Sequence, residues 1–212
     1  MQTKKRIILG SASPRRRELL EQIGISFEVR VSDKEEVYHS LIPEEIVKEL
    51  ALSKAENVAD DLREKQEQVK QISFDKKNNV LLDTIVIGAD TIVVSDGSIL
   101  GKPKDEADAV RMIRSLQGRS HKVYTGVAIL DYDDEGKRKS VVHAVETEVF
   151  VNPMSDEEIR EYAATGEPLD KAGAYGIQGQ FAAYIERIDG DYYNVVGLPV
   201  SYVYRQLKEI AE

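Results

Sequence analysis

The chain has 212 residues, of which 42% are apolar. This length suits one domain or two small lobes with a substantial core and excludes a long solenoid. The 29 basic and 38 acidic residues give a net charge of −9, the wrong sign for neutralising a nucleic-acid backbone or an anionic membrane as a main task. With no cysteine, a disulfide framework, a thiolate nucleophile and a cysteine-ligated zinc site are excluded. We expect one cytosolic domain, residues 1–212, without nucleic-acid or membrane partners.

The N-terminal third predicts a β-loop-α-β unit followed by a longer helix. Lys5–Leu9 reads as a strand, and the small residues after it lead to Pro14, which favours the first position of a helix with Ser13 as N-cap. A second helix is expected to begin at Pro43 and to reach about Val58 or beyond. Residues 60–79 are so polar and charged that we expect a peripheral insertion, made of an exposed helical extension and a loop.

The rest of the chain mixes strands and helices. In order, we expect a central strand over 85–94, a helix capped by Asp105, a hairpin of strands 122–132 and 139–151, a helix opened by a capping box at Ser155, a glycine-rich loop over 170–179, a second hairpin of 181–188 and 192–196, and a C-terminal helix from Pro199. The mixture predicts an α/β fold with a mixed sheet flanked by helices.

Three consecutive arginines open the first helix, in the run Ser11-Ala12-Ser13-Pro14-Arg15-Arg16-Arg17. Cations at a helix N-terminus oppose the macrodipole, at a cost of roughly 0.3–1 kcal/mol each when exposed. A bound phosphate would reverse this penalty, because backbone N–H groups, dipole and guanidinium groups would all face it. The alternative is that the three arginines are solvated and fan apart.

Asp90 interrupts the apolar run 85–94 at a position that should be buried. An unpartnered ionised carboxylate there would cost several kcal/mol, on the order expected for buried charges. The position therefore indicates a metal, a cation or a catalytic role. Gly88 and Ala89 would allow a ligand to approach the backbone closely. The alternative is an ordinary turn between two short strands.

Two lysines and one glutamine are further candidates. Lys54 lies on the inward stripe of its helix, where it could reach an anion or extend to solvent. Lys102 follows the Asp90 strands and could share their cleft, or could lie in a surface loop. Gln178, in the loop 170–179, could bind the edge of a nucleobase or be solvated. The three histidines show no metal-ligand spacing, and no phosphate-loop or Rossmann motif is present.

Taken together, five motifs resemble the Maf family, and they follow one another in order over nearly the whole chain. They are Ser11-Ala12-Ser13-Pro14-Arg15-Arg16, Gly88-Ala89-Asp90-Thr91-Ile92-Val93, Gly101-Lys102-Pro103, Tyr124-Thr125-Gly126-Val127 and the run from Glu167 to Gly179. Only residues 60–79 look longer than is usual in the family. The resemblance implies a two-lobed fold with a central cleft, similar to that of the inosine triphosphatases.

The resemblance also implies an activity: a nucleoside triphosphate pyrophosphatase that leaves a nucleoside monophosphate and pyrophosphate. By position, Asp90 is similar to the family's catalytic acid or base. The substrate-selecting positions Arg15, Thr91 and Gln178 resemble the branch that prefers dTTP and UTP. Further residues of the expected substrate site are Ser13, Arg16, Lys54, Lys102 and Lys171.

A divalent cation belongs to this reading. The resemblance places Glu36 in the same cleft as Asp90, and two carboxylates suit Mg²⁺ or Mn²⁺, which bridge protein oxygens to phosphates. A water activated by the metal or by Asp90 could then attack the α-phosphorus. The rival hypothesis is a non-catalytic, nucleotide-binding regulator of cell division. The sequence leaves open whether the protein forms a homodimer.

Overall fold

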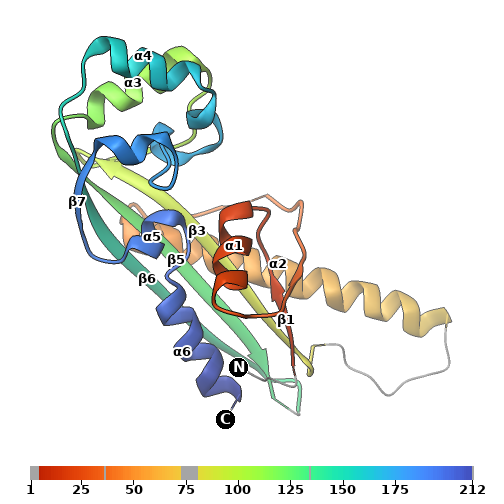
Figure 1. The fold of residues 1–212 in the computed structure, drawn as a ribbon. Helices are drawn as coiled ribbons and strands as arrows, with labels where there is room; N and C mark the ends of the chain where they lie inside the picture. The colour runs from red at the N-terminus through yellow and green to blue at the C-terminus, as the bar shows by residue number, and fades with distance from the viewer. Residues whose placement is uncertain (1–4, 36, 73–80, 134, 212) are drawn as a thin grey trace.

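The computed structural model describes residues 5–35, 37–72, 81–133 and 135–211. A seven-stranded mixed sheet organises the chain, with strands in the order β2-β1-β3-β5-β6-β7 and β4 paired to β3 (Figure 1). The first strand, β1, lies parallel to both β2 and β3, whereas the pairs from β3 onward are antiparallel. The expected α/β fold with a mixed sheet flanked by helices is confirmed.

Most helices and strands lie close to the residue ranges predicted from the sequence. The strands are β1 (Arg6–Leu9), β2 (Glu28–Val29), β3 (Thr84–Ser95), β4 (Ser98–Leu100), β5 (Ser120–Tyr132), β6 (Arg138–Val151) and β7 (Ile185–Asp189). The helices are α1 (Pro14–Gln22), α2 (Pro43–Ile72), α3 (Glu106–Leu116), α4 (Asp156–Ala164), α5 (Tyr192–Val196) and α6 (Val200–Ala211), with 3₁₀ segments at Glu167–Asp170, Ala172–Ala174 and Gln180–Tyr184. Among the described residues, no helix is both long enough and apolar enough to cross a membrane.

Helices cover both faces of the sheet. The odd-numbered residues Ile85, Ile87 and Ala89 of β3 enter a large core with α1, α3, α4 and α6. The even-numbered Val86 enters a smaller core beneath α2. In Figure 1, α3, α4 and the 3₁₀ segments gather at one end of the sheet, while α1 and α2 lie along the other part. The period of two along β3 therefore decides which helix each of its residues meets.

Two glycines let α2 approach the sheet closely. A Cβ atom added to Gly88 would lie 2.2 Å from the carbonyl oxygen of Ala51, and one added to Gly126 would lie 2.0 Å from that of Val47. Both contacts are with helix backbone, which cannot move aside as a flexible side chain could. The close approach predicted at Gly88 is therefore made by a helix of the same chain and not by a ligand.

The helical extension predicted after residue 58 is confirmed, because α2 continues to Ile72 and its later turns project beyond the body of the protein (Figure 1). The remainder of the predicted insertion, residues 73–79, lies outside the described residues. The capping predictions also hold: Asp105 accepts the N–H of Asp108, and Ser155 forms a complete capping box with Glu158.

The predicted hairpin of 181–188 and 192–196 is wrong. Residues 185–189 form β7, which pairs with β6, and residues 192–196 form the helix α5. Asp191 caps this helix by accepting the N–H of Tyr193 at 2.8 Å. The fully buried Asn194 donates to the carbonyl of Val123 and to the hydroxyl of Thr147. Capping and these tertiary hydrogen bonds override the strand propensity of the aromatic and β-branched residues.

His121, on β5, is only 3% exposed and packs edge-on against the ring of Tyr175. Its Nε2 lies 2.7 Å from the Tyr175 hydroxyl, and its Nδ1 has no hydrogen-bond partner. Burial lowers the pKa of His121 to about 4, because the charged imidazolium would lose its hydration. The imidazole is thus a neutral support beneath the segment that carries Tyr175.

This histidine should make the fold sensitive to acid. The unfolded chain has an ordinary histidine pKa near 6.5, so between about pH 6.5 and 4 it binds a proton that the folded chain does not. The free energy of unfolding should therefore have its full value above pH 6.5 and should decrease by about 3 kcal/mol as the pH falls to 4. His121→Gln should flatten this part of the curve of unfolding free energy against pH, measured by urea denaturation, with the exposed His143→Gln as control. Identical curves for His121→Gln and the wild type would contradict the assignment.

Candidate functional site

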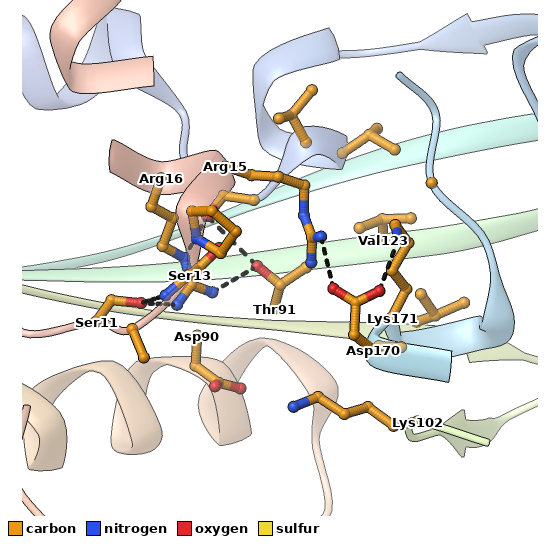
Figure 2. A pocket seen from close by; sticks show the side chains of 18 of the residues that line it. Ser11, Ser13, Arg15, Arg16, Asp90, Thr91, Lys102, Val123, Asp170 and Lys171 are labelled. Carbon is orange, nitrogen blue, oxygen red and sulfur yellow. Dashed lines mark hydrogen bonds and ion pairs between the residues drawn. The ribbon is translucent and has the colours of Figure 1, made fainter. Parts of the chain in front are cut away.

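A cavity of about 710 Å³ lies beside the middle of β3, and Figure 2 shows side chains that line it. One part of its wall is formed by the loop before α1, by the first turn of α1 and by residues 31–34. The rest is formed by α2, the middle of β3, the 167–179 segment and residues 195–197. Nine residues expected in the site line it: Ser13, Arg15, Arg16, Lys54, Asp90, Thr91, Lys102, Lys171 and Gln178. The tenth, Glu36, lies outside the described residues.

The cavity has the opposite charge to the protein as a whole. Among the described residues, six cationic and three anionic side chains line it, in a chain whose net charge is −9. The cations are Arg15, Arg16, Lys34, Lys54, Lys102 and Lys171, and the carboxylates are Asp90, Glu167 and Asp170. A local excess of positive charge in a concave site concentrates anionic ligands there.

The first two arginines of α1 have different surroundings. Arg16 is 8% exposed, and its guanidinium donates to the carbonyls of Gly197 at 2.8 Å and Ala89 at 2.9 Å. It also donates to the hydroxyls of Ser11 and Thr91. The arginines of this run therefore differ in their partners. Arg16 is held by acceptors of the protein itself, whereas Arg15 extends into the cavity, where it could meet a bound anion (Figure 2).

A chain of hydrogen bonds runs from Arg16 across one face of the sheet, from β3 to β5. Thr125 donates to the carbonyl of Asn194 at 2.9 Å, so the 2.8 Å contact between the two threonine hydroxyls has Thr91 as donor. Thr91 in turn accepts from Arg16 at 3.1 Å. Because each hydroxyl both accepts and donates, the orientation of Thr91 is fixed from both sides.

Asp90 meets a cation on the other face of the same strand. It is adjacent to Thr91, and successive side chains of a strand point to opposite faces. Its Oδ1 lies 2.5 Å from the Nζ of Lys54 on α2, with side-chain exposures of 15% and 19%. The cost of placing a carboxylate in β3 is thus offset by a charged partner. Of the alternatives for Asp90, the ordinary turn is wrong, because β3 is continuous from Thr84 to Ser95.

Lys102 returns to the same region through the β3–β4 hairpin. In that hairpin Leu100 pairs with Val93, so the chain after β4 runs back toward the middle of β3. Figure 2 shows the side chain of Lys102 directed toward Asp90. The prediction that Lys102 and Asp90 share one cleft is confirmed.

Asp170 joins two of the cavity's cations. Its Oδ2 accepts from Arg15 at 3.2 Å, and its Oδ1 accepts from Lys171 at 2.7 Å (Figure 2). Partial burial raises the pKa of Asp170, but the hydrogen bonds and charges of Lys171 and Arg15 outweigh it and leave the pKa below its ordinary value. Asp170 lies within the motif from Glu167 to Gly179 but is not among the predicted site residues, and its position next to Lys171 is the signal in the sequence that could have indicated it.

The segment after Asp170 has an unusual backbone. Gly173 has a φ of 71°, and Ala174, which is fully buried, has a φ of 60°. A Cβ atom on Gly173 would lie 2.9 Å from the side chain of Val93. Positive φ at a buried alanine is strained, and such strain persists only where the surrounding structure imposes it. This backbone carries the chain to Gln178, which is exposed on the cavity wall.

Several residues of the cavity wall were not predicted as site residues, among them Glu167, Lys34 and Asn57. Lys34 pairs with Asp61 of α2 at 3.0 Å, which attaches the 31–35 segment to that helix. Within the described part of the chain, no cluster of three or more metal-ligating side chains occurs. Asp90 is the described carboxylate that was expected to bind a metal.

Known proteins resemble this chain over almost its full length. The family model described as "Maf-like protein" matches residues 6–210. A protein of Agathobacter rectalis named dTTP/UTP pyrophosphatase is 46% identical and covers 96% of this chain and 97% of its own. A protein of Bacillus cereus with the same name is 48% identical and covers 97% of this chain and 90% of its own. A solved structure of the Staphylococcus aureus Ham1 protein is 16% identical, covers 68% of this chain and 72% of its own, and has a TM-score of 0.37.

The contrast between the two arginines predicts different effects on stability. Arg16→Ala would leave buried acceptors without a donor, each worth about 1–3 kcal/mol when unsatisfied, so the melting temperature should fall by on the order of 10 °C. Arg15→Ala removes one ion pair whose carboxylate is 61% exposed, an interaction worth about 0–1 kcal/mol. Differential scanning calorimetry without ligand measures both variants. Equal losses would show that the two arginines share one structural role.

Proposed function

The chain belongs to the Maf family, and we propose that it is a nucleoside triphosphate pyrophosphatase that hydrolyses dTTP and UTP. The products are the nucleoside monophosphate and pyrophosphate. The observation that carries the proposal is the cavity that brings together six cations, an acidic residue on a central strand and a glutamine-bearing loop. Relatives that cover more than nine-tenths of this chain have the same activity in their names.

The phosphates would bind among the cations. Arg15 at the start of α1, Lys171 and Lys102 project from three sides of the cavity. The loop before α1 adds backbone N–H groups, and Ser13 makes no side-chain cap to that helix, so the helix start can receive an anion. Arg16, whose guanidinium already has four protein acceptors, would support this region instead of supplying its main phosphate contact.

The base would be selected by hydrogen bonding to a side-chain amide of the same cavity. A side-chain amide offers a donor and an acceptor together, which matches the mixed donor and acceptor edge of uracil and thymine. Gln178 presents such an amide on the cavity wall, and Thr91 and Arg15 line the same cavity. We assign these three residues to substrate selection, as the family resemblance implies.

The chemistry would be an attack of water on the α-phosphorus. The new bond joins the water oxygen to the α-phosphorus, the bond from that phosphorus to the bridging oxygen breaks, and pyrophosphate leaves with the electron pair. The water's proton needs an acceptor, and the Asp90 carboxylate faces the cavity. Lys54, 2.5 Å away, orients this carboxylate and adds positive charge where the anionic transition state forms.

We propose that a divalent cation binds beside Asp90 together with the substrate. Mg²⁺ in phosphate-transfer sites is held by one or two carboxylates together with substrate phosphates and waters. Asp90 provides one such carboxylate on the cavity wall, and Glu36 is the second that we propose. When bound, Mg²⁺ or Mn²⁺ would neutralise phosphate charge and polarise the α-phosphate.

The setting of the enzyme follows from composition. A chain with no cysteine and a net charge of −9 suits a reducing compartment and a small anionic substrate met by a local cationic site. We propose a cytosolic protein that does not use nucleic acid as a partner.

Product analysis tests the proposed reaction. The purified protein is incubated with Mg²⁺ and each of a panel of nucleoside triphosphates, and the products are separated by ion-exchange chromatography. We expect dTTP and UTP to give monophosphate and pyrophosphate in equal amounts. Release of orthophosphate and a diphosphate would contradict the cleavage site. If every triphosphate is bound but none is cleaved, the non-catalytic regulator becomes the better hypothesis.

Asp90→Asn tests the mechanism, because it keeps the size of the side chain while removing its charge and basicity. Turnover of dTTP should fall at least ~10²-fold, the lower end of what a positioned acid or base contributes. Asp131→Asn is the matched control: Asp131 pairs with Lys5 at the same distance of 2.5 Å and with 13% exposure, but it is not among the residues that line the cavity. Near-normal kcat in folded Asp90→Asn at saturating Mg²⁺ would remove Asp90 from the chemistry.

A further inference from the structure

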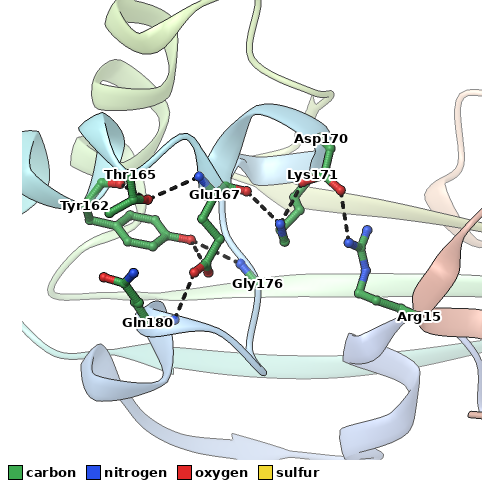
Figure 3. Close-up of polar contacts among 8 residues, drawn as sticks. All are labelled: Arg15, Tyr162, Thr165, Glu167, Asp170, Lys171, Gly176 and Gln180. Atoms are coloured by element: carbon green, nitrogen blue, oxygen red, sulfur yellow. Dashed lines mark hydrogen bonds and ion pairs between the residues drawn. The ribbon is translucent and has the colours of Figure 1, made fainter. Parts of the chain in front are cut away.

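The carboxylate of Glu167 lies near Gly176 and Gln180, the two labelled residues that bracket Gln178 in the sequence (Figure 3). Its two oxygens accept hydrogen bonds from two different places. Oε1 accepts from the hydroxyl of Tyr162 at 3.0 Å, and Oε2 accepts from the backbone N–H of Gln180 at 3.1 Å. The Tyr162 hydroxyl also accepts the backbone N–H of Gly176 at 3.4 Å. Glu167 and Tyr162 together therefore hold residues 176 and 180, which bracket Gln178.

The loop backbone packs directly on this carboxylate. A Cβ atom on Gly179 would lie 2.0 Å from Oε1 of Glu167, so the chain comes as close as a glycine allows. Gly179 also closes a turn by donating to the carbonyl of Gly176 at 3.2 Å. The turn that contains Gln178 therefore packs directly against the Glu167 carboxylate.

Glu167 is itself fixed by the end of α4. Its N–H donates to the hydroxyl of Thr165 at 3.1 Å, and that hydroxyl donates to the carbonyl of Tyr162 at 2.7 Å. Its own carbonyl accepts from Lys171 at 2.6 Å. Tyr162 is 3% exposed, and burial, followed by the adjacent Glu167, raises its pKa, so its hydroxyl stays a donor. The anchor belongs to the rigid helical part of the fold.

We propose that Glu167 is a positioning residue that sets the placement of Gln178 and thereby the enzyme's discrimination between pyrimidine bases. The inference rests on the proposed function, in which Gln178 reads the base. Glu167 acts through the loop: both its oxygens accept from neutral donors of the protein, a hydroxyl and a backbone N–H. Its backbone carbonyl also orients Lys171, so one residue connects the base-binding and phosphate-binding parts of the cavity.

Glu167→Gln is the sharpest variant, because an amide has the size of a carboxylate but only one acceptor oxygen. Two donors face the side chain, so the amide N–H₂ group must meet either the Gln180 N–H or the Tyr162 hydroxyl, which would then have to turn and accept in place of donating. We expect the selectivity for UTP over CTP, measured as the ratio of kcat/KM values, to fall about five- to twentyfold, the range of roughly one misplaced hydrogen bond. The loss should arise in KM, with kcat for UTP changed less than about twofold.

Three companion variants separate positioning from other roles. Tyr162→Phe removes the hydroxyl that contacts both Glu167 and Gly176 without changing charge, and it should shift selectivity in the same direction. Glu161→Gln, an exposed residue of α4, makes the same charge change away from the loop and should have no effect. In a Gln178→Ala background, Glu167→Gln should cause no further loss of selectivity, because effects through one residue are not additive.

The outcomes separate this inference from the proposed function. Unchanged selectivity in folded Glu167→Gln, or additive losses with Gln178→Ala, would overturn the positioning role. A large fall in kcat at unchanged selectivity would also overturn it, because Glu167 would then contact a metal or the reacting atoms. If the wild type cleaves no triphosphate, the proposed function fails. Equilibrium binding of UTP and CTP to the same variants, by isothermal titration calorimetry, then still measures the discrimination.

Discussion

The guanidinium of Arg16 reaches acceptors from three separate parts of the chain: Ser11 before α1, Ala89 and Thr91 on β3, and Gly197 after α5. A planar group with five donors in fixed directions can satisfy such a set, whereas a lysine ammonium presents a single point charge. One of the two carbonyls it holds is that of Ala89, the residue before Asp90. The placement of Asp90, the proposed proton acceptor, and of Thr91 therefore depends on one buried arginine.

The cavity also depends on how closely α2 approaches the sheet. Gly88 and Gly126 lie on neighbouring strands beneath this helix and admit its backbone where any side chain would collide. That approach brings Lys54 to Asp90 on one face of β3, while the next residue, Thr91, meets Arg16 on the other face. Two adjacent residues thus receive their partners from two different helices, and the cavity lies where both are accessible.

Three of the cavity's cations are paired with anions of the same cavity. Lys54 pairs with Asp90, and Arg15 and Lys171 share Asp170. Pairing reduces the repulsion that six cations would otherwise exert on one another. Because Asp170 is 61% exposed, its ion pairs are worth only about 0–1 kcal/mol each. A phosphate group can take its place beside Arg15 and Lys171 at little cost in free energy.

The sequence alone determined the local elements and the composition of the site. Caps at Asp105 and Ser155 and the period of the apolar residues marked helices and strands, because these signals act between residues close in the chain. The motifs contain eight of the residues that the structure places around one cavity, and the helix position of Lys54 indicated the ninth. Two stretches differ from the prediction: residues 181–184 belong to a 3₁₀ segment in place of a strand, and 192–196 form a helix. The buried Asn194 of that helix hydrogen-bonds to β5 and β6, contacts that no local pattern encodes.

Only the tertiary structure decided which partners each of these residues contacts. Arg15 and Arg16 are adjacent and chemically identical in the sequence, yet one is buried among carbonyls and the other extends toward Asp170. Glu167 and Gln178 lie eleven positions apart, and their connection depends on Tyr162 and on a turn that packs against a carboxylate. Such roles depend on which acceptors surround a side chain in space, and those acceptors come from parts of the chain that only folding brings together.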